Sequence, residues 1–120
     1  LPLTPAKFHI LLALARGEQH GYAIMVDVEA RTGGSFTLGP GTLYGAIKRL
    51  LEEGLIEETE ERPDPALDDE RRRYYKLTEL GLRVTSGEAA RLAKLVELAR
   101  ASHVFGQGLG KRLGDEPQGA

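Results

Sequence analysis

The chain contains no cysteine, no tryptophan and a single methionine, and aromatic residues make up only 6% of its 120 residues. Without cysteine, disulfides, thiol redox sensing and cysteine zinc sites are excluded. No apolar run is long enough to cross a bilayer, and no signal peptide is visible, so we expect no membrane partner and a cytoplasmic location. The length and the hydrophobic content of 41% indicate one compact domain with its own core.

Residue patterns for catalysis or metal binding are also lacking. The three histidines show no metal-ligand spacing, and no serine or threonine has an evident base beside it in the sequence. Gly106, Gly108 and Gly110 superficially resemble a phosphate-binding loop, but they follow no expected strand and open no expected helix. We therefore expect a protein that is not an enzyme and that uses no metal or cofactor.

The net charge of −2 conceals an uneven distribution. Residues 57–70 contain eight acids and one arginine, a net −7 that leaves +5 on the rest of the chain. Because a DNA partner responds to a local basic face and not to the total charge, the acidic total does not exclude a nucleic-acid partner.

The most informative stretch is residues 37–56, TLGPGTLYGAIKRLLEEGLI. We expect a helix from Pro40 to Glu53 with Gly54 ending it, since proline suits a first turn and glycine the position after the last. The residues that recur at the spacing of one buried face are Leu43, Ile47, Leu50 and Leu51. The residues expected on the opposite, exposed face are Thr42, Tyr44, Gly45, Lys48, Arg49 and Glu52.

This exposed face is unusual for a helix that only covers a core. Gly45 costs about 1 kcal/mol relative to alanine in a helix interior, which makes sense where a partner approaches the backbone closely. Lys48 and Arg49 suit phosphates or guanine edges in a DNA major groove. The residues that we predict to contact DNA here are Pro40, Gly41, Thr42, Tyr44, Gly45, Lys48 and Arg49. The alternative is that Gly45 and Tyr44 serve tight packing against a neighbouring helix.

Two helices are expected before this stretch. With Thr4 as N-cap and Pro5 in the first turn, the first helix should run to about Arg16. It is apolar nearly all the way round, which indicates cover on more than one side and, in so small a domain, a second copy of the chain. The second helix is expected over residues 22–31, with His20 as a helix-start or packing residue. Three helices joined by short loops match the helix-turn-helix plan, in which the later helix reads DNA.

A β-hairpin is expected next, as the wing of a winged helix. Residues 55–60 alternate loosely, and residues 71–77 (RRRYYKL) return as an aromatic-rich strand whose face ending in Leu77 packs on the core. Basic residues at the base of the hairpin suit phosphates beside the recognition helix. The wing residues added to the predicted DNA contacts are Arg72, Arg73 and Lys76. The alternative is an edge strand protected by its charges.

The last helix is expected from its N-cap, Thr78, to about Ser102. Its polar residues leave only a narrow stripe between Arg91 and Arg100, so it too has more apolar surface than one small domain covers. We expect it to be a dimerisation helix that packs on its symmetry mate and on the partner's first helix; the alternative is a helix folded back on its own core. The residues predicted at this interface are Phe8, Leu11, Leu12, Leu92, Leu95, Val96 and Ala99.

Together these patterns predict a mainly α chain with a small β-hairpin (α+β). Residues 1–77 would form a winged helix-turn-helix DNA-binding domain, residues 78–105 the dimerisation helix, and residues 106–120 a disordered, glycine-rich tail. The predicted function is DNA-binding transcriptional regulation by a homodimer. The alternative is a winged helix used for protein interaction alone, which would carry an apolar or acidic face on the helix from Pro40 to Glu53.

The motifs along the chain resemble those of the PadR family of bacterial transcriptional regulators. The segments that carry the resemblance are HGY at 20–22, GPGTLY at 39–44, KRL at 48–50, GLI at 54–56, and RRYYKLT at 72–78 with Gly81. The resemblance runs from about Pro5 to Ala101, and the single C-terminal helix resembles the short subtype of the family.

This resemblance implies a homodimeric repressor that binds an inverted-repeat operator in double-stranded DNA. It also implies release by a small hydrophobic, phenolic or drug-like effector, which by analogy binds near the dimer interface around Phe8, Leu12, Leu92 and Val96. Two features depart from the family's pattern. Some drug-binding relatives hold aromatic ligands with a tryptophan of the last helix, which this chain lacks, and the acidic residues 64–70 argue against a wing tip in the minor groove.

Overall fold

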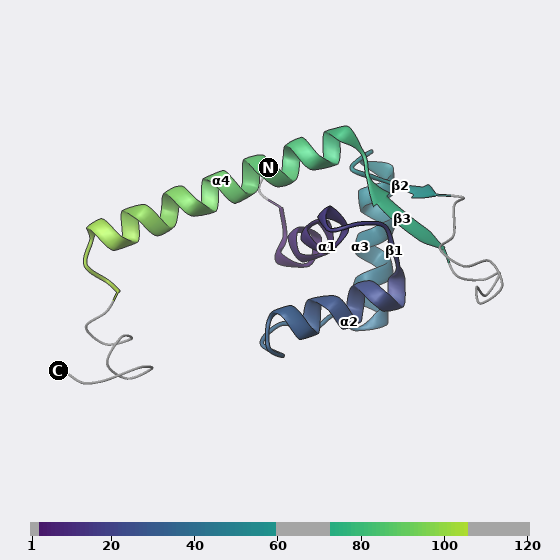
Figure 1. Ribbon diagram of the computed structural model, residues 1–120, viewed down its shortest axis with the longest axis horizontal. Coiled ribbons are helices and arrows are strands. Elements are labelled where there is room, and N and C mark those ends of the chain that lie inside the picture. The colour runs from purple at the N-terminus through teal and green to yellow at the C-terminus, as the bar shows by residue number, and fades with distance from the viewer. Residues whose placement is uncertain (1–2, 60–72, 106–120) are drawn as a thin grey trace. The chain divides into compact units, whose positions relative to one another are not determined.

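The structure is a computed structural model that describes residues 3–59 and 73–105. The helices are α1 (Pro5–Ala15), α2 (Gly21–Arg31), α3 (Pro40–Glu52) and α4 (Glu79–Ala101). The strands are β1 (Gln19–His20), β2 (Ile56–Thr59) and β3 (Tyr74–Leu77). Helices α1, α2 and α3 pack on one another, with the strands beside them (Figure 1). The predicted class, mainly α with a small sheet, is confirmed.

The sheet has three antiparallel strands in the order β1-β3-β2. The register places Ile56 opposite Leu77 and Glu58 opposite Tyr75, as a hairpin wing requires. Strand β1, in which His20 lies opposite Tyr74, was not expected: Gln19 was placed in a connection and His20 at the start of a helix. A two-residue strand exists only because β3 pairs with it, so its own sequence carries no periodic signal.

The core of residues 1–88 comes mainly from one face each of α1, α2 and α3. The fully or nearly fully buried side chains include Ile10, Leu11, Leu14, Ile24, Val28, Leu43, Ile47 and Leu50. The periodicity of α3 therefore predicted its buried face, with one error: Leu51 is 36% exposed. It lies at the edge of the buried stripe, one residue beyond Leu50 in the last full turn, so helical rotation turns it toward solvent.

Side chains cap the helices where the sequence predicted. Thr4 Oγ1 accepts a hydrogen bond from the Lys7 N–H (3.2 Å) at the start of α1. His20 Nδ1 accepts from the Ala23 N–H (3.2 Å), which confirms His20 as a helix-start residue. Gly54 ends α3 with a φ of 76°, a left-handed conformation that favours glycine.

The turn after α3 is bound tightly to the start of α4. Thr78 Oγ1 accepts from the Gly81 N–H (2.9 Å) as the predicted N-cap and donates to the Gly54 carbonyl (2.7 Å). The Thr78 N–H donates to the Leu55 carbonyl (3.1 Å). A Cβ added to Gly81 would lie only 1.9 Å from the same carbonyl oxygen, so the two segments meet backbone to backbone.

Ion pairs tie the helices together at the surface. Lys7 Nζ lies 2.8 Å from Glu53 Oε2, which joins α1 to the end of α3. Arg16 and Arg31 both bind the Asp27 carboxylate, Arg31 through its Nε at 3.1 Å. Partial burial works against ionisation of Asp27, but hydrogen bonds and charges from the two arginines outweigh it and hold its pKa below the ordinary value.

The chain divides into two units, residues 1–88 and residues 89–120. The first unit contains the winged helix together with the beginning of α4, and the described part of the second is the remainder of that helix and residues up to 105. The predicted tail at 106–120 lies outside the described residues. No helix in the described part of the chain has the length and apolarity needed to cross a membrane.

Candidate nucleic-acid interface

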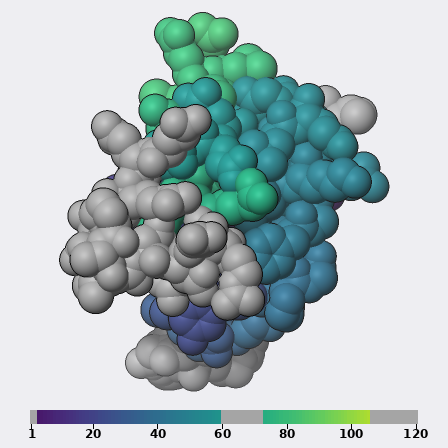
Figure 2. Space-filling model, turned by 90° about the vertical axis from the view of Figure 1, so that its right-hand side faces the viewer, coloured from purple at the N-terminus to yellow at the C-terminus, as the bar shows by residue number. Residues whose placement is uncertain are grey.

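The outer face of α3 is exposed along the helix. Figure 2 looks onto the side of the molecule where α3, blue to teal, lies at the surface beside the strands. The residues of this face that are exposed are Pro40, Gly41, Thr42, Tyr44, Gly45, Lys48 and Arg49. All seven were predicted to contact DNA, and all seven lie at the surface of the same helix, α3.

The charge on this face is uncompensated within the described part of the chain. Neither Lys48 nor Arg49 has an acidic partner among residues 3–59 and 73–105. The first turn of α3 contains no acidic residue, and Gly39 offers no side-chain cap. The N–H groups and the positive dipole end of that turn are therefore open to an anion.

Gly45 and Tyr44 differ in their surroundings. A Cβ added to Gly45 would meet nothing within 4 Å, so packing against a neighbouring helix of the described chain does not explain this glycine. Tyr44 is 49% exposed, yet its ring lies directly against Gly21 at the start of α2. The packing alternative is thus wrong for Gly45 within the described chain and right for one side of Tyr44.

The basic residues of the wing are paired with acids of the neighbouring strand. Arg73 Nη1 lies 2.8 Å from Glu58 Oε2, and that carboxylate raises the pKa of Arg73. Lys76 Nζ lies 3.8 Å from Glu57 Oε2. Arg72, the third predicted wing contact, lies outside the described residues. A phosphate that approaches either of these described wing cations would therefore compete with a carboxylate.

Sequence reasoning missed these pairs because it placed Glu57 and Glu58 in the strand expected over residues 55–60 without aligning that strand with its partner. The structure places both in β2, directly across from β3. Opposite charges on neighbouring antiparallel strands come within reach when they share a face. The register sets Glu57 opposite Lys76 and Glu58 opposite Tyr75, and Arg73 reaches Glu58 from just before the start of β3.

The tyrosines of β3 support the sheet and do not face solvent. Tyr74 is 8% exposed and meets His20 edge to face, with ring centroids 5.3 Å apart. Tyr75 is 5% exposed and belongs to the core, with Leu77 packed against that core as predicted. Burial, with the negative charge of Glu58, raises the pKa of Tyr75, so its phenol stays neutral near pH 7.

The predicted dimer residues fall into three groups by exposure. Leu11 is fully buried in the core of the chain itself, which leaves no surface for a partner. Leu95 and Val96 of α4 are 47% and 42% exposed. The remaining members are partly buried: Phe8, Leu12, Leu92 and Ala99.

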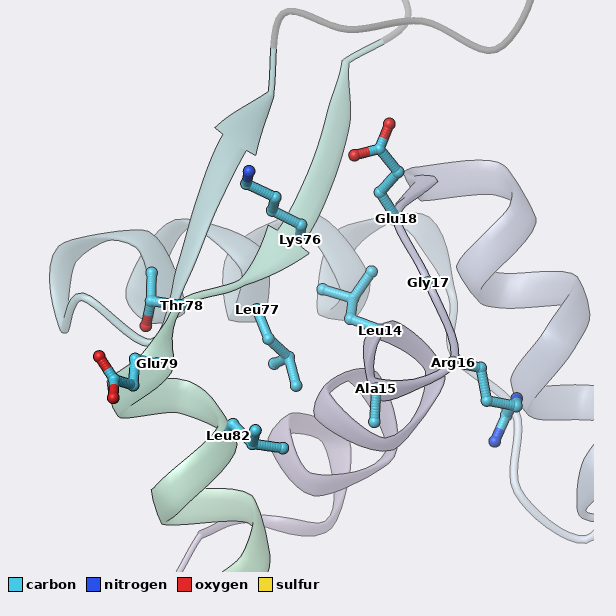
Figure 3. Close-up of a pocket in the computed structure, with 10 residues that line it drawn as sticks. All are labelled: Leu14, Ala15, Arg16, Gly17, Glu18, Lys76, Leu77, Thr78, Glu79 and Leu82. Carbon is cyan, nitrogen blue, oxygen red and sulfur yellow. The ribbon is translucent and has the colours of Figure 1, made fainter.

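The larger hollows of the first unit lie elsewhere. A shallow groove of about 550 Å³ has the apolar side chains of Leu14, Leu77 and Leu82 facing one another, with Lys76 and Glu18 at one end (Figure 3). Of the residues predicted to line an effector pocket, Leu12 borders a smaller, 180 Å³ hollow between α1 and α2. Among the described residues, no three histidine, aspartate or glutamate side chains gather as a metal site would require.

Residues 10–86 match the family described as "Transcriptional regulator PadR-like family". A 37.1 kDa protein in transposon TN4556 of Streptomyces fradiae is 39% identical over 90 residues, 75% of this chain but 24% of that protein. Protein X of Lysinibacillus sphaericus is 32% identical over 72 residues, 60% of this chain and 63% of that protein. The chain thus spans less than two thirds of either relative.

Solved structures share the fold. A transcriptional regulator from Clostridium thermocellum aligns with a TM-score of 0.67 at 24% identity, covering 82% of this chain and 89% of that one. A PadR family transcription regulator from Clostridium difficile aligns with a TM-score of 0.66 at 23% identity, covering 82% and 97%. The PcaV regulator of Streptomyces coelicolor, in complex with its natural ligand, aligns with a TM-score of 0.64 at 26% identity, covering 83% and 62%. The family match covers more than half of the chain, and the chain belongs to the PadR-like family of transcriptional regulators.

Proposed function

We propose that this regulator binds double-stranded DNA by inserting α3 into the major groove. The observation that carries the proposal is the exposed face on which Lys48 and Arg49 have no acidic partner in the described chain. Gly45 leaves room for close approach of the helix backbone, and Tyr44 offers a hydroxyl to bases or phosphates. The family is one of regulators and not of enzymes, so the proposal includes no reaction.

The proposed binding species is a homodimer that acts as a repressor on an inverted-repeat operator. Exposed Leu95 and Val96 share one side of α4 and would be covered by a second copy. Two copies of α3 would then enter successive major grooves about 34 Å apart, one helical turn. The operator would lie in the bacterial cytoplasm, where we place the protein.

We further propose that a small hydrophobic, phenolic or drug-like effector releases the dimer from DNA. Support comes from PcaV, a regulator of the same fold described in complex with its natural ligand. The proposed pocket is at the dimer interface around Phe8, Leu12, Leu92 and Val96, of which Leu12 borders a hollow within one chain.

Fluorescence anisotropy across a salt series tests the DNA proposal. The purified protein is titrated onto labelled duplex from upstream of its own gene and onto a scrambled duplex of equal length. We expect salt-dependent binding that prefers the upstream duplex at two chains per site. Tyr44→Ala should weaken specific binding more than non-specific binding, because a base contact carries sequence information and a phosphate contact does not.

Two other results would redirect the proposal. Equal, weak binding to both duplexes would place the operator elsewhere or make binding depend on the effector. Absence of binding even at low salt would favour the alternative, a winged helix that recognises another protein.

A further inference from the structure

Gly21, the first residue of α2, occupies a position that admits no side chain. A Cβ built on it would lie 2.5 Å from Tyr44 Oη and 2.8 Å from Cε1 and Cζ of the same ring. Its φ lies outside the left-handed region, so the backbone there would accept other residues. Space for the Tyr44 ring is therefore the reason for a glycine at this position.

The Tyr44 ring is held on one side and free on the other. The hydroxyl end of the ring lies against Gly21, while 49% of the residue remains exposed. The Tyr44 phenol is also one of the groups that act electrostatically on Tyr75 of β3. The ring thus lies where the start of α2 meets the exposed face of α3.

A tyrosine on an open helix surface samples several rotamers, and ordering it on binding reduces affinity. The contact with Gly21 removes part of that cost before any partner arrives. Gly45 provides the contrast, because a Cβ there meets nothing. One glycine leaves space outward for a partner, and the other leaves space inward for a neighbouring side chain.

We propose that Gly21 is a positioning residue that orients the Tyr44 ring for contact with DNA. The inference deepens the proposed DNA-binding function and rests on it. Gly21 itself touches no DNA in this scheme and acts through Tyr44. Adding one methyl group at residue 21 would push the ring away without straining the backbone, since the obstructing atoms are the far end of a side chain.

The first test needs no DNA. The four tyrosines are labelled with 3-fluorotyrosine, and Tyr44→Phe identifies the Tyr44 resonance in ¹⁹F spectra. Gly21→Ala should shift that resonance more than the other three. Gly87→Ala is the matched control, because a Cβ there also lies in a helix but meets nothing within 4 Å, and it should leave the Tyr44 resonance in place.

The second test is a double-mutant cycle on operator DNA. Gly21→Ala should weaken specific binding about two- to tenfold, the range expected for ordering one side chain on binding. The same substitution in a Tyr44→Ala background should change affinity less than twofold, because the ring on which Gly21 acts is gone. Thermal melts accompany the cycle: if Gly21→Ala alone lowers the melting temperature, Tyr44→Ala should restore it by removing the clash.

Three results would overturn the inference. One is an unmoved Tyr44 resonance in Gly21→Ala, and another is an equal loss of affinity in both backgrounds. The third is a loss of stability in Gly21→Ala that persists without the Tyr44 ring. Failure of the unmodified protein to bind any duplex would instead refute the proposed function, and the fluorine spectra would still report separately whether Gly21 orients the ring.

Discussion

Replacing Glu58 by glutamine, which removes the ion pair with Arg73, should strengthen DNA binding and steepen its dependence on salt. The Arg73 guanidinium lies 2.8 Å from the Glu58 carboxylate on the exposed surface of the wing. If a phosphate displaces the carboxylate from Arg73, the freed Glu58 carboxylate attracts a cation from solution. This uptake offsets the release of one counterion from the DNA, so the net number of cations released on binding is smaller. Glu58→Gln removes that uptake while keeping the shape of the side chain.

The expected size follows from counterion release. Each phosphate contact contributes about 0.9 to the slope of log affinity against log salt, so one freed arginine steepens the slope by about 0.9. Between 200 mM and 50 mM salt this corresponds to an additional three- to fourfold gain in affinity, roughly, over the unmodified protein. Anisotropy titrations at four or more salt concentrations, on specific and scrambled duplexes, measure the slope.

Glu29→Gln is the matched control, because it removes one exposed negative charge of α2 that has no ion pair with any cation among residues 3–59 and 73–105. If the only effect were weaker repulsion between the protein's negative charges and DNA, the two variants would change the salt slope by the same amount. If Glu58→Gln and Glu29→Gln give the same slope, the reasoning is refuted and Arg73 contacts no phosphate. If Glu58→Gln flattens the slope, the ion pair holds the wing in its binding geometry.

Four further predictions concern stability and assembly. Gly81→Ala should cost about 1–3 kcal/mol of unfolding free energy, since its Cβ would overlap a backbone carbonyl at 1.9 Å, whereas Gly87→Ala should gain up to about 1 kcal/mol in thermal melts. The pKa of Asp27 is lower in the folded state than its ordinary value of 3.8, so ionisation of Asp27 stabilises the fold. This contribution to the free energy of unfolding is present above pH 3.8 and is lost as pH falls through the folded-state pKa. Asp27→Asn should remove that part of the acid dependence in denaturant titrations. Leu11→Ala should cost about 2–5 kcal/mol of folding stability in the same titrations, because the side chain is fully buried. Leu95→Ala should instead weaken dimerisation in sedimentation experiments while the monomer fold persists.

Local signals predicted most of the fold. Thr4 and Thr78 were recognisable as N-caps because capping depends on a few consecutive residues. Gly54 was recognisable as the end of α3 for the same reason. Strand β1 was missed because it depends on a partner more than fifty residues away, which no local window contains.

The candidate site divides in the same way. The exposed face of α3 followed from helical periodicity, and Lys48 and Arg49 lie where it placed them. The pairing of Arg73 with Glu58 and the contact of Gly21 with Tyr44 could not be predicted. Both join residues distant in the sequence, so they follow from strand register and helix packing and not from any pattern along the chain.

The joint between α3 and α4 has a mechanical consequence. Thr78 bonds to both the Gly54 carbonyl and the Gly81 N–H, and Gly81 lies against the Leu55 backbone with no side chain between them. Because the two backbones are in direct contact and joined by hydrogen bonds, a rotation of the first turns of α4 would move the end of α3 with it. Under the proposed mechanism, an effector that rotates the first turns of α4 would reorient α3 as a rigid body. DNA binding would then change without any part of α3 unfolding.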